Sequence, residues 1–282
     1  MKVLILNYHR VCPGYHIDPE TFEWQIKTLK EKFIPLTLDD SVSFVKGKLN
    51  LKKDGFAITF DDGWADNFIY AYPILKKLNI PATIFISTDF ISKNKEYLTW
   101  EKINVMKPLI KVESHGQTHA YHFRSPKIID VYKDTLTKRQ TYLLLSGIQL
   151  KAESPIYESG SVLAYPRYYE KEKSFENFND YEDRVKTELK TSMAEISKNT
   201  GFRLKYLAWP FGEYNKTAIE IAKKIGFQSC FTTKQGFIKQ NDDYYRLKRF
   251  SPPRNNKIFL IAIKGNWCMV IYKLIIFILS IF

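Results

Sequence analysis

Short apolar runs rich in β-branched and aromatic residues alternate with amphipathic segments along most of this chain. The runs predict buried strands at residues 3–8, 33–38, 56–60, 82–87, 110–114, 162–165, 206–209 and 228–232. The intervening segments, 126–147 among them, predict helices. This alternation is typical of α/β proteins with a parallel sheet, and we expect a barrel-like arrangement of the strands.

The C-terminal end breaks this pattern. From Trp267 to Phe282 nearly every residue is apolar, and Lys273 is the one charged residue. A helix of sixteen residues at about 1.5 Å each spans only about 24 Å, which is short of a bilayer core of about 30 Å. The tail predicts either an interfacial or weakly spanning membrane anchor, or a helix docked on the barrel. We divide the chain into one α/β domain over 1–256 and an apolar tail over 257–282.

Composition narrows the class of protein. With 282 residues, of which 45% are hydrophobic and 15% aromatic, the chain can bury a full core, which excludes global disorder. Its formal net charge of +13 comes mainly from lysines that are scattered rather than clustered. Such a distribution indicates a solvated basic surface, with attraction to anionic lipid or an acidic glycan as the alternative. Since no nucleic-acid motif accompanies the lysines, we expect no nucleic-acid partner.

The cysteines and the N-terminal residues indicate the cellular compartment of the protein. Cys12, Cys230 and Cys268 are too few and too far apart for a disulfide framework, so we expect reduced structural cysteines. The apolar run before Asn7 is too short for a signal peptide. We therefore expect a cytoplasmic protein, with membrane association through the tail as a further expectation.

The run from Phe56 to Phe60 ends in two adjacent carboxylates and a glycine, Asp61-Asp62-Gly63. In a parallel α/β protein this is the C-terminal end of a strand, where active-site loops gather. Because side chains alternate along a strand, the two aspartates would point in different directions. One could then bind a metal ion while the other handles a proton. The alternative is a solvated Asp-Asp-Gly turn.

Three of the five histidines lie between His115 and His122. His115 and His119 have a spacing that is common for two ligands of one metal ion, and Gly116 favours a loop there over a helix. Two neutral imidazoles and one carboxylate leave coordination positions open for water and substrate, as hydrolytic metal sites require. Non-haem iron oxygenases use the same ligands, but the alternation of strands and helices disfavours that class.

Residues Thr59 to Gly63 and His115 to His119 together resemble the first two motifs of the NodB-type polysaccharide deacetylases, carbohydrate esterase family 4. The resemblance implies a distorted (β/α) barrel. It also implies that Asp61 is the catalytic base and that Asp62, His115 and His119 bind the metal ion. Zinc is the expected ion, and iron, cobalt and nickel are compatible with the same ligands.

The likeness extends to the poly-β-1,6-N-acetylglucosamine deacetylase branch through the stretches Asn7 to Val11, Tyr165 to Tyr169 and Trp209 to Glu213. In that branch the catalytic-acid histidine comes from the N-terminal strand, which implies this role for His9. Without the resemblance, His9 would be interpreted as a core histidine. The stretches also imply substrate contacts, which we assign to Arg167, Tyr168, Trp209, Pro210 and Phe211.

Some of these assignments carry a specific role. Arg167 is expected to orient Asp61 through a charge-assisted hydrogen bond or to contact the sugar. A backbone N–H near Phe211 is expected to help hold an oxyanion. Trp209, Tyr168 and Trp64 could stack on sugar rings, and a place in the core is the alternative for each.

The resemblance thus implies a metal-dependent hydrolase that removes N-acetyl groups from N-acetylhexosamine residues of a cell-envelope polysaccharide or a lipid-linked glycan. The partner would be that glycan, with a membrane surface as a second partner through the tail. The absence of a recognisable leader departs from the branch and favours a precursor met at the cytoplasmic face. The alternatives are an O-acetyl esterase and a non-catalytic, membrane-associated glycan-binding relative.

Overall fold

The computed structural model describes residues 1–133 and 135–264. At its centre lies a sheet of parallel strands in the order β1-β3-β4-β5-β10-β11-β12, with β2 beside β3. The strands are β1 Val3–Tyr8, β2 Ile34–Pro35, β3 Gly55–Asp62, β4 Ala82–Ile86, β5 Ile110–Ser114, β10 Tyr206–Ala208, β11 Ser229–Gln235 and β12 Leu247–Arg249.

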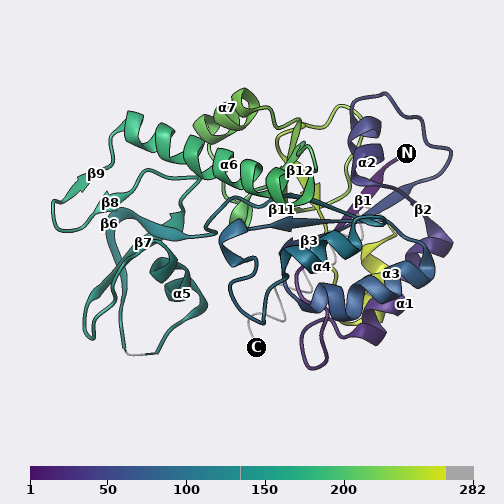
Figure 1. Ribbon diagram of the computed structural model, residues 1–282, viewed down its shortest axis with the longest axis horizontal. Coiled ribbons are helices and arrows are strands. Elements are labelled where there is room, and N and C mark those ends of the chain that lie inside the picture. The colour runs from purple at the N-terminus through teal and green to yellow at the C-terminus, as the bar shows by residue number, and fades with distance from the viewer. Residues whose placement is uncertain (134, 265–282) are drawn as a thin grey trace.

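The sheet closes on itself between its first and last strands. Phe250, which follows β12, accepts a hydrogen bond from the N–H of Asn7 at 2.8 Å and donates one to the carbonyl of Ile5 at 2.7 Å. These bonds place the end of β12 beside β1 and complete a barrel with helices around it (Figure 1). The predicted parallel (β/α) barrel is confirmed.

Helices on the outside of the barrel follow the strands. They are α1 Pro19–Lys32, α2 Leu38–Val45, α3 Tyr72–Leu78, α4 Trp100–Met106, α6 Phe178–Thr200, α7 Lys216–Ile225 and α8 Asn256–Ala262. Helix α1 begins after Asp18, because the Asp18 carboxylate accepts a hydrogen bond from the N–H of Thr21 at 2.8 Å and Pro19 occupies the first turn. A π-helical turn, Asn67–Ala71, leads into α3.

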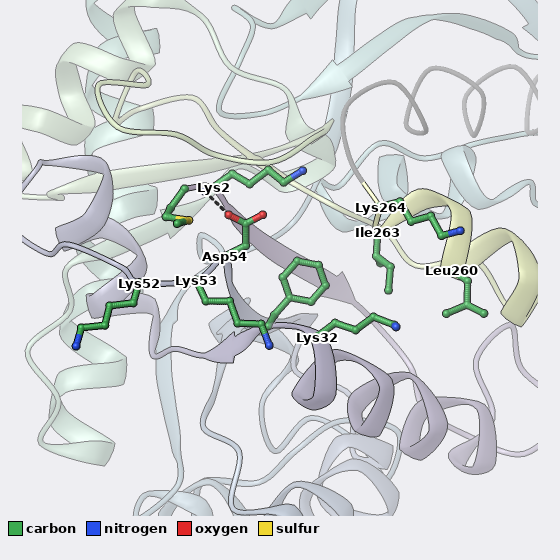
Figure 2. Close-up of a pocket in the computed structure, with 10 residues that line it drawn as sticks. Lys2, Lys32, Lys52, Lys53, Asp54, Leu260, Ile263 and Lys264 are labelled. Carbon is green, nitrogen blue, oxygen red and sulfur yellow. Dashed lines mark hydrogen bonds between the residues drawn. The ribbon is translucent and has the colours of Figure 1, made fainter.

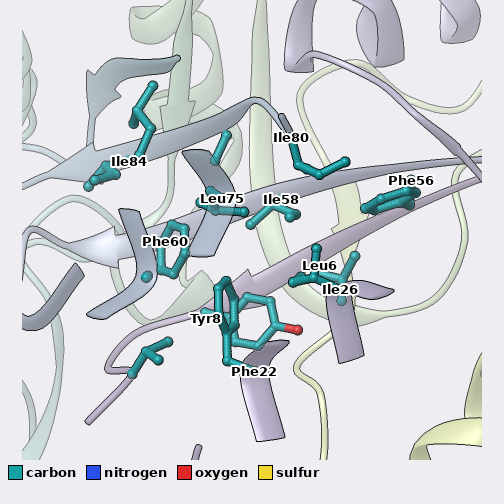
Figure 3. Close-up of a cluster of buried hydrophobic side chains, with 14 of the residues drawn as sticks. Leu6, Tyr8, Phe22, Ile26, Phe56, Ile58, Phe60, Leu75, Ile80 and Ile84 are labelled. Atoms are coloured by element: carbon teal, nitrogen blue, oxygen red, sulfur yellow. The ribbon is translucent and has the colours of Figure 1, made fainter. Parts of the chain in front are cut away.

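The largest core cluster lies between the strands β1, β3 and β4 and the helices α1 and α3 (Figure 3). Tyr8, Phe22 and Phe60 meet there at ring-centroid distances of 5.0, 5.7 and 5.8 Å. Burying each such ring contributes about 1.5–3 kcal/mol to folding. The Tyr8 hydroxyl also donates to Gln25 of α1 at 2.8 Å, which ties β1 to this helix. Because β1 pairs with β3 along its whole length, the C-terminal ends of the two strands lie next to each other.

A side lobe leaves the barrel after β5. It contains the antiparallel pair β6 Tyr121–Val131 and β7 Pro155–Ser161, the helix α5 Lys138–Leu145, and the short pair β8 Tyr168–Tyr169 and β9 Ser174–Phe175 (Figure 1). The predicted helix over 126–147 is therefore wrong over its first half. The helix starts only at a capping box, in which Thr137 and Gln140 exchange hydrogen bonds of 2.8 and 3.3 Å.

The predicted strand over 162–165 is also wrong, because these residues form a turn after β7. The N–H of Ala164 donates to the carbonyl of Ser161 at 2.9 Å, which is turn geometry. The carbonyls of Val162 and Tyr165 accept hydrogen bonds from the Arg184 guanidinium of α6 in place of a neighbouring strand.

The last described helix, α8, packs on α1. Phe259 and Ala262 are completely buried, and Phe259 meets Trp24 with a ring-centroid distance of 6.0 Å. Residues 265–282, on which the predicted anchor depends, lie outside the described residues, as does Cys268. Within residues 1–133 and 135–264, Cys12 and Cys230 are free, and no helix has the length and apolar character needed to cross a membrane.

Candidate metal centre and active site

The two aspartates at the end of β3 are both buried, and the chain turns sharply between them and α3. Asp61 is 1% and Asp62 5% exposed, so the alternative of a solvated turn is wrong. Asp62 and Gly63 have φ angles of 72° and 86°. A side chain at Gly63 would meet Ile91 at 2.9 Å, so both the backbone conformation and the close packing require glycine there.

Asp62 faces the two histidines that follow β5. Its Oδ1 lies 3.5 Å from His115 Nε2 and 3.3 Å from His119 Nε2. The three ligand atoms are near enough to share one metal ion. The Asp62 Oδ1 atom is buried and has no hydrogen-bond partner among the described residues, an unusual state for a carboxylate oxygen. A cation between the three side chains would satisfy this oxygen, so the site fits a metal ion.

Neighbouring groups orient these ligand atoms. His115 Nδ1 lies 2.8 Å from the carbonyl of Ala208, at the end of β10, which makes Nδ1 the protonated nitrogen and leaves the Nε2 lone pair free. The second oxygen of Asp62, Oδ2, accepts a hydrogen bond of 3.1 Å from Trp64 Nε1. Each contact directs a lone pair toward the shared position.

The loop between the histidines is held by a carboxylate of α6. Glu188 accepts hydrogen bonds from the N–H of Gln117 at 3.1 Å and from the N–H and hydroxyl of Thr118 at 2.7 and 2.9 Å. Gly116 has a φ of 80° and His119 a φ of 52°. Glu188 therefore fixes a loop whose left-handed residues bring His119 back toward Asp62.

Burial keeps both histidines in the neutral form that binds metals. It lowers the pKa of His115 and, against the attraction of Asp62, lowers the pKa of His119 to about 4. Aromatic rings enclose His119, with centroids at 4.3 Å for Phe211, 5.2 Å for Tyr142 and 6.0 Å for Phe90. Phe211 itself is left-handed, with a φ of 61°. Strained backbone thus gathers at Asp62, His119 and Phe211.

Asp61 points to a different partner from Asp62. Its two oxygens accept hydrogen bonds of 2.7 Å from Nη1 and Nη2 of Arg249, a fully buried residue that ends β12. The Asn7 amide nitrogen, in the orientation that satisfies the amide, lies 3.1 Å from Asp61 Oδ2. Burial raises the pKa of Asp61, but Arg249 outweighs this effect and holds the pKa well below its usual range. Asp61 is therefore an ionised carboxylate.

His9 lies at the mouth of the same site, on the loop after β1. Asp66 anchors this loop by accepting hydrogen bonds from Arg10 Nε at 2.6 Å and from the N–H of Val11 at 3.0 Å. Asn67 donates to the carbonyl of His9 at 2.9 Å. The His9 side chain is exposed and lines a cleft of about 660 Å³, and Asp62, Trp64, Tyr97 and Tyr142 line it too. The interpretation of His9 as a core residue is wrong.

Of the predicted substrate-contact residues, Phe211 packs on His119 at the metal centre, whereas the other four do not line this cleft. Trp209 is completely buried, and its Nε1 donates to the carbonyl of Tyr245 at 3.2 Å, so its predicted stacking on sugar is wrong and it belongs to the core. Pro210 and Tyr168 are also buried.

Arg167 lies over the Tyr169 ring in the side lobe, and its predicted pairing with Asp61 is wrong because Arg249 makes that contact. A sugar contact by Arg167 stays a prediction.

Comparison with known proteins agrees with this geometry. A family model described as polysaccharide deacetylase matches residues 48–230. This chain belongs to the polysaccharide deacetylase family. A poly-β-1,6-N-acetyl-D-glucosamine N-deacetylase of Staphylococcus epidermidis is 27% identical over 275 residues, covering 88% of this chain and 78% of that protein. The predicted family is confirmed.

Solved structures show the same fold. A de-N-acetylase from Aggregatibacter actinomycetemcomitans superposes with a TM-score of 0.72 at 18% identity, covering 96% of this chain and 100% of that one. IcaB from Ammonifex degensii superposes with a TM-score of 0.69 at 20% identity, covering 93% and 96% of the two chains.

Sequence analysis did not identify several contacts of this deacetylase site. Arg249 follows no recognisable motif, and its role depends on barrel closure. Tyr142 comes from the side lobe, and Glu188 lies within a long amphipathic helix. Trp64 was predicted as a sugar-stacking residue, but its hydrogen bond to Asp62 was missed, although an indole that directly follows Asp-Asp-Gly can reach back to Asp62.

Proposed function

We propose that this deacetylase is a metal-dependent hydrolase that removes N-acetyl groups from N-acetylhexosamine residues of a glycan. The observation that carries the proposal is the pairing of two different carboxylates at one strand end. Asp62 faces two neutral histidines with an unsatisfied oxygen, while Asp61 is held ionised by Arg249. One position suits a cation, and the other suits an acceptor of protons.

Asp62, His115 and His119 would hold the ion, and zinc suits a site of two imidazoles and one carboxylate. When bound, such an ion polarises a carbonyl oxygen and lowers the pKa of water. Other residues of this chain orient the ligands and exclude water. Trp64 and Ala208 keep the ligand atoms aimed at one point, and the aromatic rings around His119 exclude bulk water from that side.

Two protons must move during hydrolysis of an acetamide. Asp61 accepts the proton of the attacking water on a carboxylate oxygen, and Arg249 and Asn7 keep that carboxylate in place. His9 donates a proton to the departing nitrogen from the mouth of the cleft, a role suited to an imidazole. The amide C–N bond breaks, and acetate and a free amine leave.

The cleft and the relatives support the proposed substrate class. Trp64 and Tyr97 stack at 4.6 Å and line the cleft, so they offer an aromatic wall to a sugar ring. The Staphylococcus epidermidis relative is named for poly-β-1,6-N-acetyl-D-glucosamine. An envelope polysaccharide of this type, or its lipid-linked precursor, is the substrate we propose.

The test is acetate release from N-acetylglucosamine oligomers by the metal-loaded full chain. We expect release that stops after chelation and returns with added zinc. Asp61→Asn and His115→Ala should abolish it, while Lys190→Gln, an exposed change on α6, should not. Release from O-acetylated but not N-acetylated glycans would replace the proposal with an esterase. Glycan binding without any acetate release would show a non-catalytic relative.

A further inference from the structure

A second pocket lies at the opposite end of the barrel from the active site. It has a volume of about 690 Å³ and is bounded by the end of α1, the segment before β3, the start of β1 and the end of α8 (Figure 2). Five lysines line it: Lys2, Lys32, Lys52, Lys53 and Lys264. Asp54 is the one acidic residue of the lining.

The positive charge of this pocket is largely uncompensated. None of the five lysines forms an ion pair with a carboxylate among the described residues. Lys53 donates to the carbonyl of Glu31 at 3.2 Å, and Lys2 lies over the Phe237 ring at 4.1 Å. Asp54 already accepts a hydrogen bond of 3.0 Å from the N–H of Lys2. Five cations around one carboxylate attract an anion of high charge density.

Part of the pocket lining is apolar. Phe33, Leu260 and Ile263 line it together with the lysines, and Phe33 and Ile263 are buried. The pocket thus offers cations beside an apolar surface, as an amphiphile requires. A small inorganic anion would leave the apolar part without a partner.

The sequence that continues from the pocket points to the same kind of ligand. Lys264 is a lining residue, and the next eighteen residues of the chain, 265–282, contain a single charge, Lys273. A basic cluster next to an apolar segment is typical of chains that contact anionic lipid.

We propose that this lysine pocket binds the phosphate headgroup of an anionic phospholipid and seats the base of the barrel on a membrane surface. The lysines contact the phosphate, and Phe33, Leu260 and Ile263 face the glycerol and acyl region. This proposal does not depend on the proposed deacetylase activity, because it concerns the other end of the fold.

The placement orients the active site. Strand β3 begins at Gly55, beside the pocket, and ends at Asp62 in the metal site, seven residues later along the barrel. Seven steps of about 3.3 Å separate the two ends by roughly 23 Å. With its base on the membrane, the enzyme would open its cleft away from the lipid surface, toward glycan chains that extend from it.

The test uses the full chain and two kinds of vesicle, one of phosphatidylcholine alone and one with added phosphatidylglycerol. The partition coefficient for vesicles with phosphatidylglycerol, divided by that for vesicles without it, measures the charge-dependent part of binding. The contribution of the tail cancels, since the tail is the same in every variant. The triple variant Lys32→Gln, Lys52→Gln and Lys53→Gln should lower this ratio by more than tenfold, because each lysine at an anionic surface changes partitioning about five-fold.

The matched control is the triple variant Lys190→Gln, Lys216→Gln and Lys224→Gln. These lysines are also exposed, lie on α6 and α7 and carry the same total charge. We expect the control to keep the wild-type ratio, and all variants to keep their acetate release from soluble oligomers. If this ratio falls equally in both triple variants, binding depends only on the net charge of the protein, and the proposal is overturned. A last experiment adds a low concentration of inorganic phosphate or of soluble glycerophosphoglycerol to vesicle-bound protein. If both release the protein equally well, the pocket is a site for small anions and the proposal is overturned.

Discussion

Asp61 and Arg249 form a two-point ion pair with both nitrogen–oxygen distances at 2.7 Å, although 188 residues separate them in the chain. Both side chains are almost completely buried. Arg249 Nε also donates to the carbonyl of Thr232 at 3.0 Å, so the guanidinium cannot rotate away. The orientation of the proposed base is therefore determined by a residue of the last barrel strand.

Arg249→Met should leave a buried carboxylate without its cation. We expect the free energy of unfolding to fall by about 3–5 kcal/mol and acetate release to fall by more than about 100-fold. Urea unfolding and acetate release measure the two effects. The double variant Asp61→Asn with Arg249→Met should regain most of the stability and none of the activity. A double variant no more stable than Arg249→Met would contradict this account.

Trp64→Phe should weaken metal binding without disturbing the aromatic wall. The change removes the hydrogen bond from Nε1 to Asp62 Oδ2 and keeps a ring that can stack on Tyr97. We expect metal affinity to fall by about 10–100-fold, measured by competition with a chromogenic chelator. Tyr97→Phe is the control, because it changes the other ring of the same stack and leaves the Trp64 hydrogen bond to Asp62 in place. Equal losses in both variants would assign the effect to the stack.

His9→Gln should separate proton donation from metal binding. We expect acetate release to fall by about 10²–10⁴-fold while zinc stoichiometry stays at the wild-type level. His16→Gln is the matched control, since His16 is exposed on the same loop and also lines the cleft. Loss of zinc from the His9 variant would show that His9 is a ligand and not an acid.

Because Glu113 on β5 is buried, we expect the free energy of unfolding to decrease as the pH rises. Burial outweighs its hydrogen bonds from the N–H groups of Lys205 and Tyr206, at 2.8 and 2.9 Å, and raises its pKa to about 8. Between the ordinary pKa of 4.5 and about 8, the folded state keeps a proton that the unfolded state releases. The free energy of unfolding therefore decreases as pH rises through this window, by up to several kcal/mol in total.

Glu113→Gln should remove this decline, because the amide oxygen can accept the same two hydrogen bonds and does not titrate. Urea unfolding at intervals from pH 5 to 8.5 measures the slope for both proteins. Glu220→Gln, a change at an exposed position of α7, should keep the wild-type slope. An unchanged slope in Glu113→Gln would place the titrating group elsewhere.

The parts of the site that were predictable are those for which local sequence determines position. Asp61 and Asp62 end an apolar run, and parallel strands bring that end beside the loop of His115 and His119. The capping box of Thr137 and Gln140 was also readable, and it would have placed the start of α5 correctly.

The parts that were not predictable depend on contacts distant in the chain. Arg249 ends a three-residue strand, and only the closed barrel reveals that it meets Asp61. Arg167 was assigned from the likeness of Tyr165 to Tyr169 to the deacetylase branch, after a predicted strand over 162–165. Arg184 instead binds the carbonyls of that segment and makes it a turn. Trp209 directly follows β10, and the strand pattern does not reveal that its ring turns into the core.

The closure of the barrel has a consequence for synthesis of the protein. The proposed metal ligands, Asp62, His115 and His119, all lie in the first half of the chain and within the region matched by the family model. Arg249 lies outside that region and reaches Asp61 only when Phe250 has bonded to β1. A nascent chain can thus carry a complete ligand set long before its base is aligned. On the proposed mechanism, catalysis requires the last strand, so we expect chains that end before Arg249 to release no acetate from acetylated glycans.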